Sequence, residues 1–147
     1  MNIPEKYRPF DRPTLIVVTD NVQAKLFKAD GREVNLVHLI SKKLEPMEQE
    51  RSAVMTGAGP RSADEHNKGE LKAWTRERLY TELSTDLMHR LQAKEFEALA
   101  FTAPEEDMNE LKECLHVDLL KHATVFVPKD LVNDELVDIV IHVQDEM

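Results

Sequence analysis

The stretch TLIVVTDNVQAKLFKADGREVNLVHLISK, residues 14–42, decides how the fold begins. Its first six residues, TLIVVT, form a continuous apolar run rich in branched side chains, which is typical of a strand buried on both faces. Residues 23–29 and 33–42 indicate two further strands, joined through Asp30-Gly31, a strong hairpin signal. We therefore expect an antiparallel meander of three strands. The third strand is predicted to carry four residues on one face: Val34, Leu36, His38 and Ile40.

Downstream of the meander the chain loses its periodicity over residues 44–65 and then becomes helical. A connection of this length is typical of a functional or disordered loop. The spacing predicts a long helix that starts between residues 62 and 66 and ends near Lys94. Its apolar face is built from leucines four positions apart, Leu79, Leu83, Leu87 and Leu91, and is supplemented by Tyr80 and Met88. At about 100° per residue, Trp74 points away from this face, so we expect the first turns to extend beyond the sheet.

The last third alternates strand and helix. The apolar residues of 97–102 and 123–127 predict two buried strands. Between them a helix is predicted to start at Pro104. After the second strand, Asn133 or Asp134 is predicted to cap a final helix through Val143. The order βββαβαβα predicts an α/β fold with a mixed five-stranded sheet, in which an antiparallel three-strand meander is extended by two parallel strands and flanked by helices on both faces. We expect residues 1–13 to form an irregular N-terminal arm and residues 14–147 a single domain.

Composition narrows the class of protein. A chain of 147 residues with 41% apolar and 32% charged residues is typical of one globular domain. Cys114 is the only cysteine, which excludes an intramolecular disulfide and a cysteine-rich zinc site. No signal peptide or membrane-length apolar run is recognisable, so we expect a cytoplasmic protein without a membrane partner.

Charge is distributed unevenly along the chain. Residues 1–94 contain 16 basic and 14 acidic groups, whereas residues 95–147 contain 3 basic and 14 acidic groups. Because nucleic-acid affinity draws on the neutralisation of phosphates, the last third is a poor nucleic-acid surface. An anionic partner would have to meet the first two thirds of the chain.

Three stretches carry a resemblance to a known family. They are VVTDNVQAKLF (17–27), AFTAPEEDMNELKECL (100–115) and VFVPKDLVNDEL (125–136), the last containing Lys129-Asp130-Leu131. Together they resemble the bacterial host attachment proteins (proteins required for attachment to host cells). That family in turn resembles the middle domain of archaeal and eukaryotic peptide-chain release factors, and the resemblance implies a ribonuclease-H-like fold. In those factors a meander is followed by a Gly-Gly-Gln loop and a long helix that enter the ribosomal catalytic centre.

At the place of that loop the chain reads Met55-Thr56-Gly57-Ala58-Gly59-Pro60-Arg61. It has two glycines but no Gly-Gly pair and no following glutamine, and the resemblance assigns both features to peptidyl-tRNA hydrolysis. This departure counts against release activity. Gly57 and Gly59 would still permit a positive-φ loop that approaches a ligand closely, or simply a flexible loop.

The sequence gives little support for other catalytic functions. A ribonuclease-H-type nuclease needs several carboxylates that converge on a divalent metal ion. The candidates are Asp20 together with Glu70, Glu82 or Asp107. The alternative is that Asp20-Asn21 forms a turn. The six histidines show no metal-ligand spacing, and no nucleophile elbow, Walker loop or dinucleotide-binding motif is present. We expect no cofactor and no metal, and the sequence does not support an enzyme.

The start of the long helix and the loop before it hold the most informative surface. In the loop the candidate binding residues are Gly57, Gly59 and Arg61. On the helix the candidates are Lys68, Lys72, Trp74, Arg76 and Arg78. Clustered cations can contact phosphates while an aromatic stacks on an unpaired base, but the same residues would also suit a protein partner, a homodimer contact or an ordinary solvated helix.

Our hypothesis from the sequence is a non-catalytic binding module that engages the ribosome, structured RNA or a protein partner through residues 44–65 and the start of the helix. A factor that contributes indirectly to attachment to host cells is the alternative that the family name suggests. A degenerate peptidyl-tRNA hydrolase and a metal-dependent nuclease are the remaining alternatives.

Overall fold

The computed structural model describes the backbone of residues 1–42 and 61–147, and the side chains of residues 1–42 and 72–147. Five strands form one sheet in the order β3-β2-β1-β4-β5. The strands are β1 (Phe10–Thr19), β2 (Gln23–Gly31), β3 (Glu33–Ser41), β4 (Ala98–Thr102) and β5 (Ala123–Val127). The helices are α2 (Arg61–Gln92), α3 (Met108–Cys114), α4 (Val117–His122) and α5 (Leu136–Glu146), with a short 3-10 helix η1 (Glu105–Asp107) ahead of α3.

The strand directions confirm the expected fold class. β1, β2 and β3 form an antiparallel meander, while β4 pairs in parallel with β1 on one side and with β5 on the other. Gly31 has a φ of 61° at the turn between β2 and β3, as the Asp30-Gly31 hairpin signal predicts, because a non-glycine residue rarely adopts this backbone conformation. The molecule is thus an α/β mixed sheet of three antiparallel and two parallel strands.

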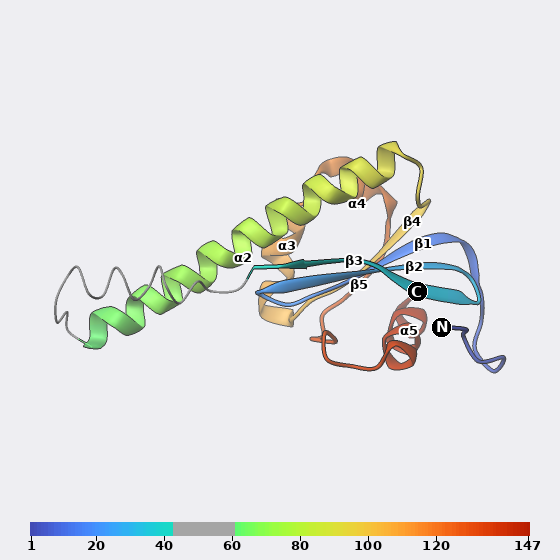
Figure 1. Ribbon diagram of the computed structural model, residues 1–147, viewed down its shortest axis with the longest axis horizontal. Helices are drawn as coiled ribbons and strands as arrows, with labels where there is room; N and C mark the ends of the chain where they lie inside the picture. Colours follow the sequence, from blue (N-terminus) through green and yellow to red (C-terminus); the bar gives the residue numbers. More distant parts are fainter. Residues whose placement is uncertain (43–60) are drawn as a thin grey trace.

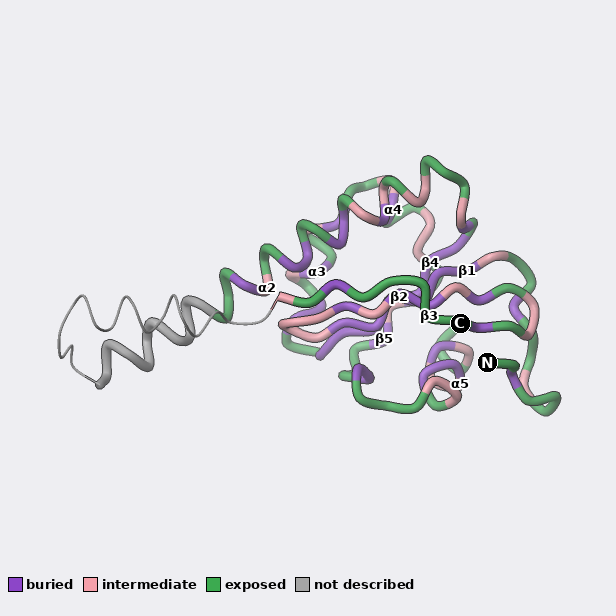
Figure 2. The backbone as a smooth tube through the Cα atoms, viewed as in Figure 1, coloured by how far each residue is buried: buried purple, intermediate pink, exposed green. Residues whose placement is uncertain are grey.

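Helices cover both faces of the sheet (Figure 1). On one face α2, α3 and α4 pack over a core that includes Leu15, Leu26, Leu83 and Phe101. On the other face α5 covers a second core that includes Ile16, Phe27 and Ile139. Figure 2 shows the buried residues concentrated along β1, β2 and β4 and on the sheet-facing sides of the helices.

Helix α2 is longer than the sheet that it crosses, and its N-terminal part extends past the sheet (Figure 1). Leu79, Leu83 and Leu87 are fully buried, as their spacing predicts. The helix ends beside Lys94, which adopts a φ of 58°. In the part of the chain that the structure describes, no helix has the length and apolar character needed to cross a membrane.

The third strand differs from the sequence prediction. Leu26 pairs with His38 and Phe27 with Leu36, so Val37 is an extra residue in β3 and forms a β-bulge. A bulge reverses the alternation of faces beyond it. Val34 therefore belongs to the core under α5, whereas Ile40 belongs to the core under α2, and the predicted common face of Val34, Leu36, His38 and Ile40 is wrong.

The beginning of the chain is more ordered than an irregular arm. β1 starts at Phe10, and Asn2 forms an isolated bridge with Glu33. The Met1 ammonium donates to the carbonyl oxygen of Val34 at 2.8 Å. The Arg32 guanidinium donates to the carbonyl oxygens of Pro4 at 3.0 Å and Tyr7 at 2.8 Å. These bonds fasten the first residues to the turn between β2 and β3.

The helix expected after Pro104 is interrupted. α3 ends at Cys114 because Leu115 is extended, with φ −82° and ψ 138°. His116 then caps a separate helix, α4, through a hydrogen bond from the Asp118 backbone N–H to its Nδ1 at 3.1 Å. α4 is an additional helix that is absent from the element order expected from the sequence. The last helix is α5, whose N-cap is Glu135 and not Asn133 or Asp134.

Candidate nucleic-acid interface

Trp74 lies on the outer side of α2. Its side chain is 51% exposed, in agreement with the prediction that it points away from the leucine face. The guanidinium carbon of Arg78 lies 4.7 Å from the centroid of the indole ring, within the range of a cation–π contact. Residues four apart share one face of a helix, so Trp74 and Arg78 form a single exposed pair, which we call the Trp74–Arg78 pair.

Lys72 is also exposed, at the position where the described side chains of α2 begin. It precedes Arg76 by four residues and therefore lies on a different side of the helix from Trp74. The basic binding candidates on the described part of the helix thus divide between two roles. Lys72 and Arg78 present charge to solvent, whereas Arg76 turns toward α3.

Arg76 is engaged by two carboxylates from other elements. Its Nη1 lies 3.5 Å from Oδ1 of Asp107, the last residue of η1, and its Nε donates to Oε2 of Glu110 on α3. We call these three residues the Arg76 cluster. Burial alone would lower the pKa of Arg76, but the hydrogen bond to Glu110 and the charges of Glu110 and Asp107 raise it. Arg76 therefore stays charged and ties α2 to α3.

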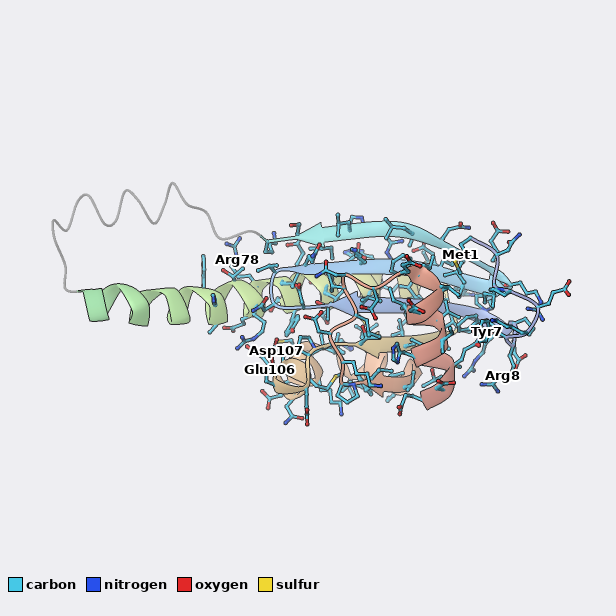
Figure 3. All side chains as sticks on the ribbon, turned by 90° about the horizontal axis from the view of Figure 1, so that it is seen from below. Met1, Tyr7, Arg8, Arg78, Glu106 and Asp107 are labelled. Carbon is cyan, nitrogen blue, oxygen red and sulfur yellow. The ribbon has the colours of Figure 1, made fainter. Side chains whose placement is uncertain are left out.

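Asp107 is only 6% exposed. Burial raises its pKa, and the neighbouring Arg76 charge opposes this effect. Figure 3 shows Arg78 and Asp107 on opposite sides of α2. Residues 76 and 78 are about 200° apart around a helix, which explains why one guanidinium meets solvent and the other meets α3.

Tyr80 extends this contact toward the end of β1. Its side chain is fully buried, and its hydroxyl donates to the carbonyl oxygen of Asp20 at 3.3 Å. Burial raises the pKa of Tyr80 well above its ordinary value. The Tyr80 hydroxyl is therefore a structural hydrogen-bond donor.

Where their side chains are described, the carboxylates considered for a nuclease are engaged in structural contacts, Asp107 with Arg76. Oδ1 of Asp20 accepts hydrogen bonds from the backbone N–H groups of Val22 at 2.8 Å and Gln23 at 2.9 Å, which makes it a turn residue. Glu82 pairs with Lys42. Among residues whose side chains are described, no group of three His, Cys, Asp or Glu could hold a metal ion. The side chain of Glu70 lies outside the described residues.

Several sequence candidates stay untested. Gly57 and Gly59 lie outside the described residues. Arg61 and Lys68 lie within α2, but their side chains are outside the described part. Their proposed roles in binding stay predictions.

The Arg76 cluster is the feature that sequence reasoning missed. The acidic run Glu105-Glu106-Asp107 after Pro104 is visible in the sequence, but acidic residues are also favourable at a helix N-terminus, so the run alone does not identify Arg76 as a partner. Cys114 is half-buried and packs against the core, and burial raises the pKa of its thiol, as expected for a packing residue.

A second surface feature lies further along α2. A shallow hollow of about 310 Å³ is lined by Ser84, Thr85, Met88, His89, Gln92 and His116. It begins more than two helical turns after Trp74, so it is separate from the Trp74–Arg78 pair.

Comparison with known structures supports the fold. The crystal structure of archaeal translation termination factor aRF1 is similar to this chain with a TM-score of 0.51 and 13% sequence identity. The similarity covers 90% of this chain and 37% of that chain, so this chain spans little more than a third of the length of the archaeal factor. At this identity the likeness concerns the fold alone.

Comparison of sequences supports the family. No curated protein matches the chain. Residues 13–143 match the family described as "Bacterial archaeo-eukaryotic release factor family 12". The release-factor resemblance expected from the sequence is thereby confirmed, whereas a role in host attachment is not shown. The chain belongs to bacterial archaeo-eukaryotic release factor family 12.

Proposed function

We propose that this protein is a non-catalytic binding module that engages ribosomal RNA through the Trp74–Arg78 pair. The observation that carries the proposal is the exposed indole, whose ring is approached by a guanidinium at 4.7 Å on the outer side of α2. Base–aromatic stacking needs an accessible ring face, and an adjacent cation adds attraction for phosphate. The release-factor family supports a ribosomal partner, and such a partner implies a cytoplasmic location.

Two features support binding over catalysis. The segment Met55–Arg61 contains Gly57 and Gly59 but neither a Gly-Gly pair nor a following glutamine. In the described residues, the polar groups near the end of β1 are engaged in structural contacts: Asp20 in a turn, Tyr80 with the Asp20 carbonyl oxygen, and Arg76 with Asp107 and Glu110. An indirect contribution to attachment to host cells stays a separate hypothesis.

Binding to purified ribosomes and to a fluorescent structured RNA at low salt tests the proposal. Trp74→Ala should weaken RNA binding about tenfold, because stacking on one base contributes about 1–3 kcal/mol. Arg78→Gln should weaken binding less and should reduce its salt dependence, since one phosphate contact is lost. Lys121→Gln is the matched control, because it removes one exposed charge from α4.

Two outcomes would contradict the RNA proposal. In the first, the Trp74 and Arg78 variants bind ribosomes and RNA as the wild type does. In the second, neither partner binds at low salt and Trp74→Ala changes only the mass in sedimentation experiments. The second outcome would assign the Trp74–Arg78 pair to a homodimer contact, because exposed aromatic side chains also anchor protein interfaces.

A further inference from the structure

The Arg76 cluster lies where α2 leaves the body of the protein. Among the described side chains of this helix, residues 72–74 are exposed, and the first buried residue is Thr75. Arg76 follows immediately, so its ion pairs are the first polar contacts that these residues make with another element. The contact lies within one helical turn of Trp74 and Arg78.

The cluster fixes the helix from two directions. Nη1 of Arg76 meets Asp107 on η1 and Nε meets Glu110 on α3, so different nitrogen atoms of one planar group are held by different elements. A guanidinium bonded in this way has little freedom to rotate. One turn later Tyr80 adds the hydrogen bond to Asp20.

The position of Arg76 determines where the exposed pair points. Residues 74 and 78 each lie about 200° around the helix from residue 76. When Arg76 is held against α3, Trp74 and Arg78 must therefore face the opposite side. Any rotation or tilt of this part of α2 would change the direction of the indole ring.

We propose that Arg76 is a positioning residue, which holds this part of α2 against η1 and α3 and thereby sets the orientation in which the Trp74–Arg78 pair meets RNA. The effect on RNA rests on the function proposed above, whereas the effect on the orientation of Trp74 does not require a ligand.

A direct phosphate contact by Arg76 is the competing interpretation. It would require the guanidinium to leave Asp107, a carboxylate that is 6% exposed. Removing a cation that pairs with a buried carboxylate is costly because the carboxylate stays desolvated. Burial thus favours an Arg76 that remains with its two partners.

The single tryptophan of the chain provides a direct test, because intrinsic tryptophan fluorescence reports on Trp74 alone. Arg76→Met retains much of the side-chain length and removes the charge. We expect this variant to increase the amplitude of fast local motion in the fluorescence anisotropy decay of Trp74 by about twofold, since a local tether is lost. Its RNA affinity should fall several-fold although Trp74 and Arg78 are intact.

Arg90→Met is the matched control. Arg90 lies on the same helix and also pairs with two carboxylates, Asp86 at 2.8 Å and Glu95 at 3.4 Å. It is four turns from Trp74, so its loss should destabilise the protein without changing the anisotropy decay of Trp74. An equal change in Trp74 motion in both variants would overturn the proposal.

Glu110→Gln keeps the experiment decisive if Arg76→Met does not fold. If Arg76 is a positioning residue, Glu110→Gln should increase the local motion of Trp74 and weaken RNA binding. If Arg76 instead contacts phosphate directly, Glu110 competes with the phosphate for it, and Glu110→Gln should tighten RNA binding without changing the motion of Trp74. That result would overturn our inference. If the wild type binds no RNA, the proposed function fails, while the fluorescence of Arg76→Met and Glu110→Gln still decides the positioning role.

Discussion

Individual side chains in this protein divide sharply between structural and exposed roles. Arg76 and Arg78 are both basic and lie two positions apart, yet one pairs with Asp107 and Glu110 and the other approaches an exposed indole. Helical geometry alone explains the division, because two positions correspond to about 200° around the helix. Charge type is therefore a poor guide to binding function unless the face of the helix is known.

Thr102 provides a prediction at the scale of one residue. It is fully buried at the end of β4, and its hydroxyl has no hydrogen-bond partner within the described part of the chain. Thr102→Val replaces the hydroxyl by a methyl group of similar shape. We expect the free energy of unfolding to rise by about 1 kcal/mol in urea denaturation, because a desolvated hydroxyl is removed.

Thr19→Val is the control for this prediction. Thr19 is equally buried, but its hydroxyl donates to the carbonyl oxygen of Gln23 at 2.8 Å. This substitution should lower the free energy of unfolding by about 1 kcal/mol, since one buried hydrogen bond is lost while the Gln23 carbonyl oxygen keeps its bond from the Asp20 backbone N–H at 3.0 Å. A Thr102→Val variant as destabilised as Thr19→Val would show that the Thr102 hydroxyl is bonded.

At the scale of elements, the hairpin between β2 and β3 depends on one backbone conformation. Gly31 has a φ of 61°, and a Cβ atom added there would meet no heavy atom within 4 Å. Any loss in the free energy of unfolding on substitution of Gly31 must therefore come from the backbone conformation and not from a steric clash with neighbouring residues.

Gly31→Ala should lower the free energy of unfolding by about 1 kcal/mol, because alanine disfavours the left-handed region. Gly31→Asn should cost less than alanine, since asparagine tolerates this conformation. Urea denaturation of both variants measures the difference. Equal stability of the glycine and alanine proteins would show that the turn relaxes to a negative φ.

At the scale of the whole molecule, two hydrophobic cores share one sheet. Leu83 lies in the core under α2, and Ile139 lies in the core under α5. Neighbouring residues of β1, Leu15 and Ile16, contribute to opposite cores. Loss of either core would therefore remove the support of the same central strands.

We expect the two cores to unfold together. Leu83→Ala and Ile139→Ala should each lower the free energy of unfolding by about 2–5 kcal/mol, the usual cost of a large-to-small change in a core. Hydrogen exchange should show loss of protection in β1 and β4 in both variants. Protection lost only on the substituted side would show that the faces unfold separately.

The sequence by itself determined the features that depend on local periodicity and turn chemistry. The succession of the five strands along the chain, the Asp30-Gly31 hairpin, the buried leucines of α2 and the outward Trp74 follow from residues close together in the chain. Only the tertiary structure decided the features that depend on how elements dock. Arg76 meets Glu110 across 34 positions, the bulge at Val37 moves Ile40 to the opposite core from Val34, and His116 starts a separate helix. Periodicity specifies which face of an element is apolar, but the partner of a charged side chain is set by the element packed against it.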